Sequence, residues 1–101
     1  MAAAEKLAGY AMGFGELNAD LVAANVTDDY QLLDKDGKVY GKGDLPGYIA
    51  DLKKLADGMV ITDVVVDGST AWCKWQVSDI VGAGMITFGD AGVSREQLFY
   101  A

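Results

Sequence analysis

Apolar positions in the first half of the chain recur at helical spacing. In the N-terminal region they are Leu7, Tyr10, Ala11 and Phe14. This spacing predicts an amphipathic helix over residues 3–14. A short second helix is predicted from Asn18 or Asp20 to Ala24, because both side chains can cap a helix N-terminus. A third helix is predicted after Asp44, with an apolar stripe formed by Leu45, Ile49, Leu52 and Leu55 or Ala56.

The rest of the chain is patterned as strands. A first strand is predicted over Thr27–Leu33, followed by a turn at 35–38 and a brief extended return at Val39 and Tyr40. Four more are predicted at Met59–Val66, Thr70–Ile80, Met85–Phe88 and Val93–Tyr100, with a tight connection at 81–84. Short turns between successive strands indicate antiparallel neighbours. The order predicts an α+β fold with helices on one face of a curved sheet, and one domain over residues 1–101.

Composition and charge narrow the classes of function. Fifteen acidic against eight basic residues give a net charge of −7, which argues against binding to nucleic acid or to anionic membranes. The N-terminal segment has neither a signal-peptide pattern nor a membrane span, so we expect a cytoplasmic protein. Hydrophobic residues make up 51% of the chain, and we expect some of this apolar surface to be hidden in a cavity or a homodimer interface.

The inventory of reactive side chains limits the chemistry. Histidine is missing, which removes the commonest general base and the commonest metal ligand. Cys73 is the one cysteine and lies in an apolar run, so it is interpreted as a packed thiol. The run from Asp34 to Gly37 fails the calcium-loop pattern, and Gly41-Lys42-Gly43 lacks a third glycine, so no metal or other cofactor is expected.

Asp34 and Tyr10 form the candidate acid/base pair. Asp34 closes the first predicted strand, and Tyr10 lies on the apolar stripe of the first helix. A helix and a sheet could fold these two titratable groups over one pocket. A carboxyl in an apolar pocket becomes a better base, and a phenol can stabilise developing negative charge.

The order of elements resembles that of the nuclear transport factor 2-like superfamily, which includes SnoaL-like polyketide cyclases and ketosteroid isomerase. The stretches that carry the resemblance are Gly15–Ala19, Asp28–Asp34, Gly41–Leu45 followed by Tyr48, and Phe88–Tyr100. The resemblance implies a cystatin-like cone (α-α-β-α-β-β-β-β). Its curved antiparallel sheet would wrap around the helices and leave an apolar cavity, and members usually form homodimers.

The resemblance to ketosteroid isomerase also implies roles for residues. Tyr10 matches the tyrosine that donates to the substrate oxyanion, and Asp34 matches the aspartate that moves the proton. In that enzyme the surroundings tune the pKa values of the carboxyl groups. Gly84 stands where that enzyme has a second, protonated aspartate, so a second donor is missing. The structural alternative is that Tyr10 packs with its hydroxyl bonded to backbone or water, while Asp34 caps the turn at Asp36-Gly37.

Aromatic residues provide the candidate ligand-binding walls, namely Phe14, Tyr48, Trp75 and Phe88. Trp72 and Trp75 have an odd spacing in one strand, which predicts that one faces inward and the other faces a dimer partner. Asp63 and Asp79 are alternative carboxylates for a cavity, although such residues more often lie at strand ends or on the solvated face. Arg95 could pair with a carboxylate, and a surface pairing is the expected form.

Together these features predict a domain that binds a small apolar molecule. One function is that of a cofactor-free isomerase, cyclase, lyase or hydrolase, in which Asp34 is the general base and Tyr10 the hydrogen-bond donor. The alternative is a non-catalytic ligand-binding or dimerisation module of the same fold.

Overall fold

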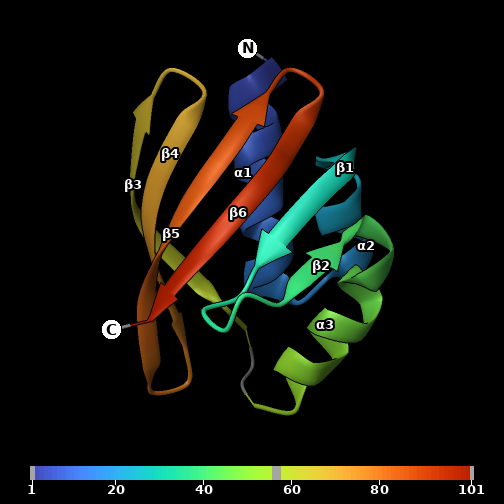
Figure 1. Ribbon diagram of the computed structural model, residues 1–101, viewed down its shortest axis with the longest axis vertical. Coiled ribbons are helices and arrows are strands. Elements are labelled where there is room, and N and C mark those ends of the chain that lie inside the picture. The colour runs from blue at the N-terminus through green and yellow to red at the C-terminus, as the bar shows by residue number, and fades with distance from the viewer. Residues whose placement is uncertain (1, 56–57, 101) are drawn as a thin grey trace.

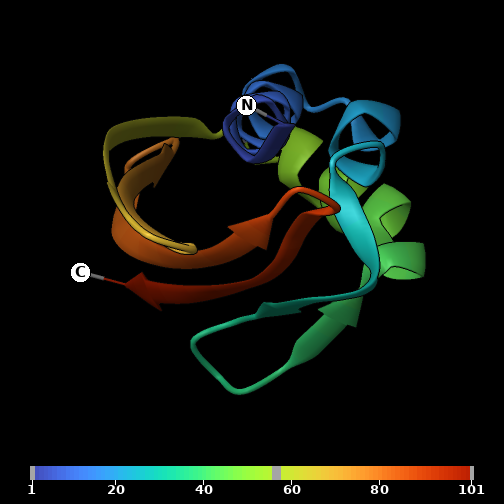
Figure 2. The same ribbon diagram turned by 90° about the horizontal axis from the view of Figure 1, so that it is seen from above.

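Three helices cover one face of a curved sheet (Figures 1 and 2). The computed structural model describes residues 2–55 and 58–100. The helices are α1 (Ala2–Glu16), α2 (Ala19–Ala23) and α3 (Leu45–Lys53), with a 3-10 turn η1 (Lys42–Asp44) before α3. The strands are β1 (Val26–Leu33), β2 (Val39–Gly41), β3 (Val60–Asp67), β4 (Thr70–Val77), β5 (Ile80–Gly89) and β6 (Gly92–Tyr100). The predicted α+β cone is therefore confirmed.

Local sequence explains where the helices begin and end. The Asn18 side chain accepts a hydrogen bond from Leu21 N at 3.1 Å and so caps α2 as predicted. Pro46 occupies the first turn of α3, where its missing N–H costs no intrahelical bond. Leu55 is exposed beyond the end of α3, and Ala56 lies outside the described residues.

The sheet is mixed and has the strand order β2-β1-β6-β5-β4-β3. The prediction of an antiparallel sheet holds for every neighbouring pair except β1 and β6, which pair in parallel, with Leu32 beside Glu96. No tight turn dictates that direction, because α3 and four strands separate β1 from β6 in the chain. The last strand thus brings the C-terminal part of the chain against the first strand.

Two predicted strand boundaries were wrong. The connection between β4 and β5 is at Ser78-Asp79, where Ser78 adopts a φ of 58°, and not at 81–84. Residues 81–84 are instead part of β5, which pairs with β4 along its length. The glycines at 82 and 84 resemble a turn signal in the sequence, but here they leave room for large side chains from neighbouring strands.

The core lies between the helices and the concave face of the sheet. Its largest fully buried side chains include Tyr10 and Phe14 of α1, Tyr30 of β1, and Ile86 of β5. On β4, Ala71, Cys73, Trp75 and Val77 face this core, and the residues between them face outward. The lone cysteine is a buried free thiol, as predicted. None of the described helices is long and apolar enough to cross a membrane.

Candidate functional site

A carboxyl group lies at the centre of the core. Glu96 of β6 is only 1% exposed, and it is the one charged residue among the buried residues that the structure describes. Tyr10 donates its hydroxyl proton to Oε1 of Glu96. The Tyr10 hydroxyl also lies 2.7 Å from that of Tyr30. Because the Tyr10 proton goes to the carboxyl, Tyr30 acts as the donor to Tyr10. The other oxygen of Glu96, Oε2, is buried without a hydrogen-bond partner.

Burial controls the electrostatics of this centre. Loss of hydration raises the pKa of Glu96 to about 7, and the hydrogen bond from Tyr10 offsets part of the shift. Burial and the adjacent Glu96 also raise the pKa values of Tyr10 and Tyr30, so both phenols stay protonated. The same two causes raise the pKa of Cys73 to about 12. Near neutral pH, only Glu96 in this group changes its charge.

Gly84 makes room for the carboxyl. A Cβ atom on Gly84 would lie 2.5 Å from Oε2 of Glu96 and 3.3 Å from Sγ of Cys73. Gly84 matches the position at which ketosteroid isomerase has its second, protonated acid. In this chain, a carboxyl from the neighbouring strand occupies the space beside that position.

Asp34 lies outside this buried centre. It is half-buried at the end of β1, and its Oδ1 accepts a hydrogen bond from Lys35 N at 2.7 Å. Its carbonyl accepts from Gly37 N at 3.0 Å, so Asp34 organises the turn that follows β1, as the structural alternative predicted. Burial, followed by the negative charge of Asp34, raises the pKa of Tyr100 to about 12. The structure thus brings Asp34 together with Tyr100 and places Tyr10 with Glu96. The catalytic roles of Asp34 and Tyr10 stay predictions.

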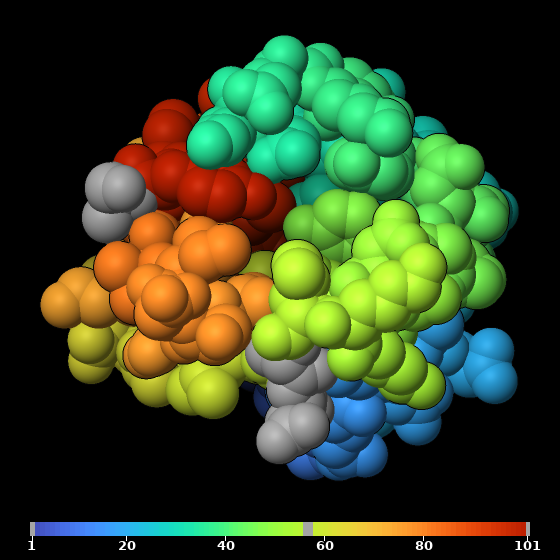
Figure 3. Space-filling model, turned by 90° about the horizontal axis from the view of Figure 1, so that it is seen from below, coloured from blue at the N-terminus to red at the C-terminus, as the bar shows by residue number. Residues whose placement is uncertain are grey.

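Figure 3 shows the lower end of the molecule, where α3 lies beside the connection between β4 and β5. A small pocket of about 50 Å³, called the mouth below, is lined there by Tyr48, Leu52, Leu55, Met59, Trp75, Val77, Ile80, Leu98 and Tyr100. Tyr100 packs edge-to-face on Trp75, with ring centroids 4.9 Å apart. An aromatic wall at the entrance suits an apolar or cationic guest.

A larger apolar cleft separates α1 from the concave face of the sheet. Its volume is about 430 Å³, within the range of small-molecule sites. One wall is the alanine-rich face of α1, and the other comes from β3 and β5. This cleft is lined by Ala3, Ala4, Leu7, Ala8, Ala11, Ile61, Val64, Val66, Gly68, Ile86 and Phe88.

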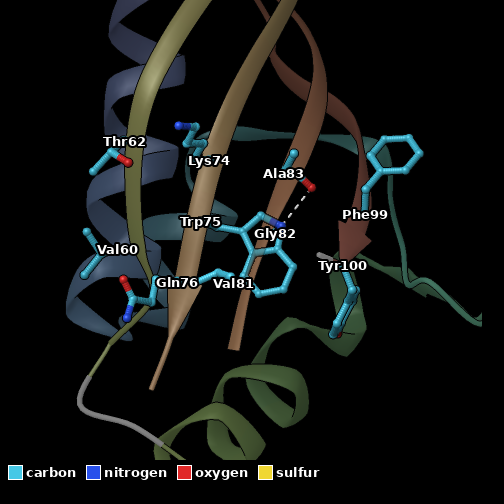
Figure 4. Close-up of a pocket in the computed structure, with 10 residues that line it drawn as sticks. All are labelled: Val60, Thr62, Lys74, Trp75, Gln76, Val81, Gly82, Ala83, Phe99 and Tyr100. Atoms are coloured by element: carbon cyan, nitrogen blue, oxygen red, sulfur yellow. Dashed lines mark hydrogen bonds between the residues drawn. The ribbon is translucent and has the colours of Figure 1, made fainter. Parts of the chain in front are cut away.

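A third hollow, of about 510 Å³, crosses the outer face of the sheet (Figure 4). Val60, Thr62, Lys74, Gln76 and Phe99 are among its lining residues. Trp75 also borders it, and its indole Nε1–H donates to the carbonyl of Ala83 at 2.8 Å. The indole covers Gly82, where an added Cβ would lie 2.4 Å from the ring.

The predicted ligand-binding walls are divided among these hollows. Tyr48 and Trp75 line the mouth, and Phe88 lines the cleft. Phe14 is buried between Tyr10 and Tyr48, with edge-to-face contacts to both rings. Neither Tyr10 nor Asp34 lines any of the three hollows. As predicted for the tryptophans, Trp75 is inside at 3% exposure and Trp72 is outside at 47%.

The remaining candidate charges are on the surface. Asp63 sits at an irregularity of β3, with a φ of 53°, and forms an exposed ion pair with Lys74 at 3.5 Å. Asp79 and Arg95 are exposed. Within residues 2–55 and 58–100, no group of three histidine, cysteine or acidic side chains could hold a metal ion.

Sequence reasoning missed Glu96. It lies in a run in which Leu98 and Phe99 are both apolar, so the alternation does not reveal which face points inward. One signal was available. If Leu98 is taken as an inward residue, Glu96 must also face inward, because residues two apart lie on the same face of a strand. Charged residues are rarely buried, which made the opposite choice the natural one.

Comparisons with known proteins bear on the fold. No family profile and no curated protein sequence matches the chain. A protein of unknown function with a cystatin-like fold from Methylobium petroleophilum is similar, with a TM-score of 0.81 at 16% identity, covering 99% of this chain and 76% of that one. TerC co-crystallised with polyporic acid gives a TM-score of 0.78 at 12% identity, covering 100% and 92% of the two chains.

A further similar structure is a protein with a ketosteroid isomerase-like fold from Catenulispora acidiphila, in complex with trimethylamine. Its TM-score is 0.76 at 14% identity, and the match covers 96% of this chain and 85% of that one. Other similar structures are described as nuclear transport factor 2-like. These matches show that the chain has a cystatin-like fold.

Proposed function

We propose that this protein binds a small, uncharged, apolar molecule in the cleft between α1 and the sheet. The observation that carries the proposal is the size and lining of the cleft, which is about 430 Å³ and almost wholly apolar. Two of the similar proteins were crystallised with small organic molecules, TerC with polyporic acid and the Catenulispora acidiphila protein with trimethylamine. They support a role for this fold in binding small molecules.

The cleft exists because small residues face half-exposed large ones. Ala4, Ala8 and Ala11 follow one another along α1, where longer side chains would fill the gap. Across from them, Val64 and Val66 keep exposed fractions of 44% and 54%. Covering both valines would contribute about 3–4 kcal/mol to binding, before the cost of ordering the ligand. An apolar guest would therefore complete the core at this point.

Filling the cleft tests the proposal. With the neutral dye Nile red as probe, wild-type protein should show saturable fluorescence enhancement. Ala8→Phe should weaken the apparent affinity at least about tenfold, because the new ring takes the ligand's volume. Ala50→Phe, on the exposed side of α3, is the matched control and should bind like wild type. Unchanged binding by Ala8→Phe would remove the cleft as the site.

Catalysis is the second candidate, and the grouping of Asp34 with Tyr48 and Tyr100 favours it. The charge of Asp34 contributes to the raised pKa values of both phenols, so a carboxylate lies close to two protonated donors that line the mouth. A cofactor-free isomerase, cyclase or lyase would use Asp34 as its general base, with Tyr10 as the predicted donor. Proton exchange at the α-carbon of cyclohexanone in deuterium oxide is a direct assay. Equal rates for wild type and Asp34→Asn would eliminate this role.

A homodimer through the outer face of the sheet is our proposal for assembly. Trp72 and Phe99 stack there, with centroids 6.2 Å apart, and Val65 beside them is exposed. Trp72, Phe99 and Val65 are 47%, 40% and 64% exposed, and covering them would supply part of the roughly 800 Å² that a standard interface buries on each side. Sedimentation equilibrium should show a dimer that Trp72→Lys dissociates and that Met12→Lys on α1 does not. A wild-type monomer at high concentration would refute it.

A further inference from the structure

The unpartnered oxygen of Glu96 is the feature that the apolar cleft does not explain. Oε2 is buried and has no hydrogen-bond donor, whereas Oε1 accepts from Tyr10. Leaving a buried acceptor unpaired costs about 1–3 kcal/mol, and more when the group is charged. Such exceptions are few in native proteins, and each one points to a missing partner or to a functional role.

This oxygen is displaced toward the mouth. Glu96 is paired in register with Ile86, but its Oε2 lies above Gly84, two residues nearer the mouth along β5. The cross-strand partner of Gly84 on β6 is Leu98, which lines the mouth. The carboxyl is thus held at one oxygen by Tyr10, while the other lies beside Gly84, whose cross-strand partner Leu98 separates it from the mouth by one side chain.

The surroundings favour a positively charged partner. The titratable groups that interact with Glu96 in the described part of the chain are Tyr10 of α1, Tyr30 of β1, Tyr48 of α3 and Cys73 of β4, and Gly84 and Ile86 of β5 lie beside it. None of these groups is basic. At the mouth, the charge of Asp34 is added to that of Glu96, since both act on Tyr48. The whole chain carries a net charge of −7.

Aromatic rings at the mouth can hold an ammonium group. The Lys35 ammonium already lies 4.6 Å from the centroid of the Tyr100 ring. Such contacts are worth about 0.5–1 kcal/mol at exposed sites and more when they are desolvated. Trp75 presents a further ring, fixed by its hydrogen bond to Ala83.

We infer that Glu96 and the aromatic mouth form a subsite for a small organic cation, such as a primary ammonium group, which enters beside Tyr48 and Trp75 and donates a hydrogen bond to Oε2. The cation would supply the missing donor and neutralise the buried carboxylate. This subsite is separate from the apolar cleft and does not depend on a ligand there.

Ethylammonium and ethanol are suitable probes, because they have the same number of heavy atoms and differ in charge. The Trp75 indole N–H resonance, followed by NMR, should move saturably with ethylammonium and much less with ethanol. Binding requires ionised Glu96, whose pKa burial raises to about 7. The apparent affinity should therefore fall about tenfold per pH unit below pH 7 and level off above it.

Charge-removing variants complete the test. Glu96→Gln should reduce ethylammonium binding at least about tenfold at pH 8, while Glu16→Gln removes the same charge from an exposed site on α1 and should bind like wild type. Equal binding of ethanol and ethylammonium would identify a site for neutral donors and overturn the cation assignment. A wild-type affinity that does not depend on pH would also overturn it, and that result needs no folded variant.

Discussion

Glu96→Gln should change how the stability of this protein depends on pH. Burial raises the pKa of the Glu96 carboxyl from 4.5 to about 7. The folded protein therefore binds one more proton than the unfolded chain between these values. Stability associated with Glu96 is complete below pH 4.5 and is lost as the pH rises through about 7, since the raised pKa belongs to the folded state.

The magnitude follows from the size of the shift. A pKa raised from 4.5 to about 7 corresponds to about 3 kcal/mol, most of which is lost between pH 5 and pH 8. For a domain of this length, that loss lowers the melting temperature by about 10–20 °C. Tyr10, Tyr30 and Cys73 do not contribute in this range, because their raised pKa values keep them neutral.

Urea unfolding of wild type and Glu96→Gln at a series of pH values is the assay. The glutamine cannot ionise, so the difference in the free energy of unfolding between the two proteins should change by about 2–3 kcal/mol in favour of the variant from pH 5 to pH 8. A constant offset between the curves is allowed, since the amide has its own hydrogen-bond needs. Parallel curves would refute the reasoning, because they would mean that Glu96 titrates alike in the folded and unfolded states.

Two further substitutions test the packing around the centre. Tyr10→Phe should lower the free energy of unfolding by about 1–3 kcal/mol, because Glu96 loses its donor and Tyr30 its acceptor; the urea midpoint would measure this, and an unchanged midpoint would contradict the network. Gly84→Ala should destabilise the protein, because its Cβ would meet Glu96 Oε2 at 2.5 Å. Gly47→Ala in α3 meets nothing within 4 Å and should stabilise the protein by about 0.5–1 kcal/mol; equal effects of the two alanines in thermal melts would show that position 84 is not crowded.

Much of the fold could be predicted because local patterns and overall structure agree. The stripe of Leu7, Tyr10 and Phe14 identified α1, and turn residues such as Asp36-Gly37 located the hairpin after β1. The boundary between β4 and β5 was missed because Gly82 and Gly84 look like turn residues in the sequence. In the structure they lie within a strand and leave room for large neighbouring side chains. The parallel pairing of β1 with β6 depends on how the whole sheet closes, which no local pattern encodes.

The candidate site was less predictable because it depends on contacts between distant segments. Tyr10 was identified, but its partner Glu96 lies 86 residues away. Asp34 attracted attention as an acid at a strand end, although its side chain bonds the backbone of the next residue. An apolar cavity was expected, but the position of the cleft was not, since it results from the spacing between the alanines of α1 and the valines of β3.

The most direct test of the proposed function is to locate a bound apolar molecule. Nuclear Overhauser effects between camphor and methyl-labelled protein would report which side chains surround the guest. The cleft predicts contacts to Val64, Val66 and Ile86, which line it, and none to Val65, which faces outward. Contacts confined to Val65 and its neighbours on the outer face, or no contacts at saturating camphor, would contradict the proposal.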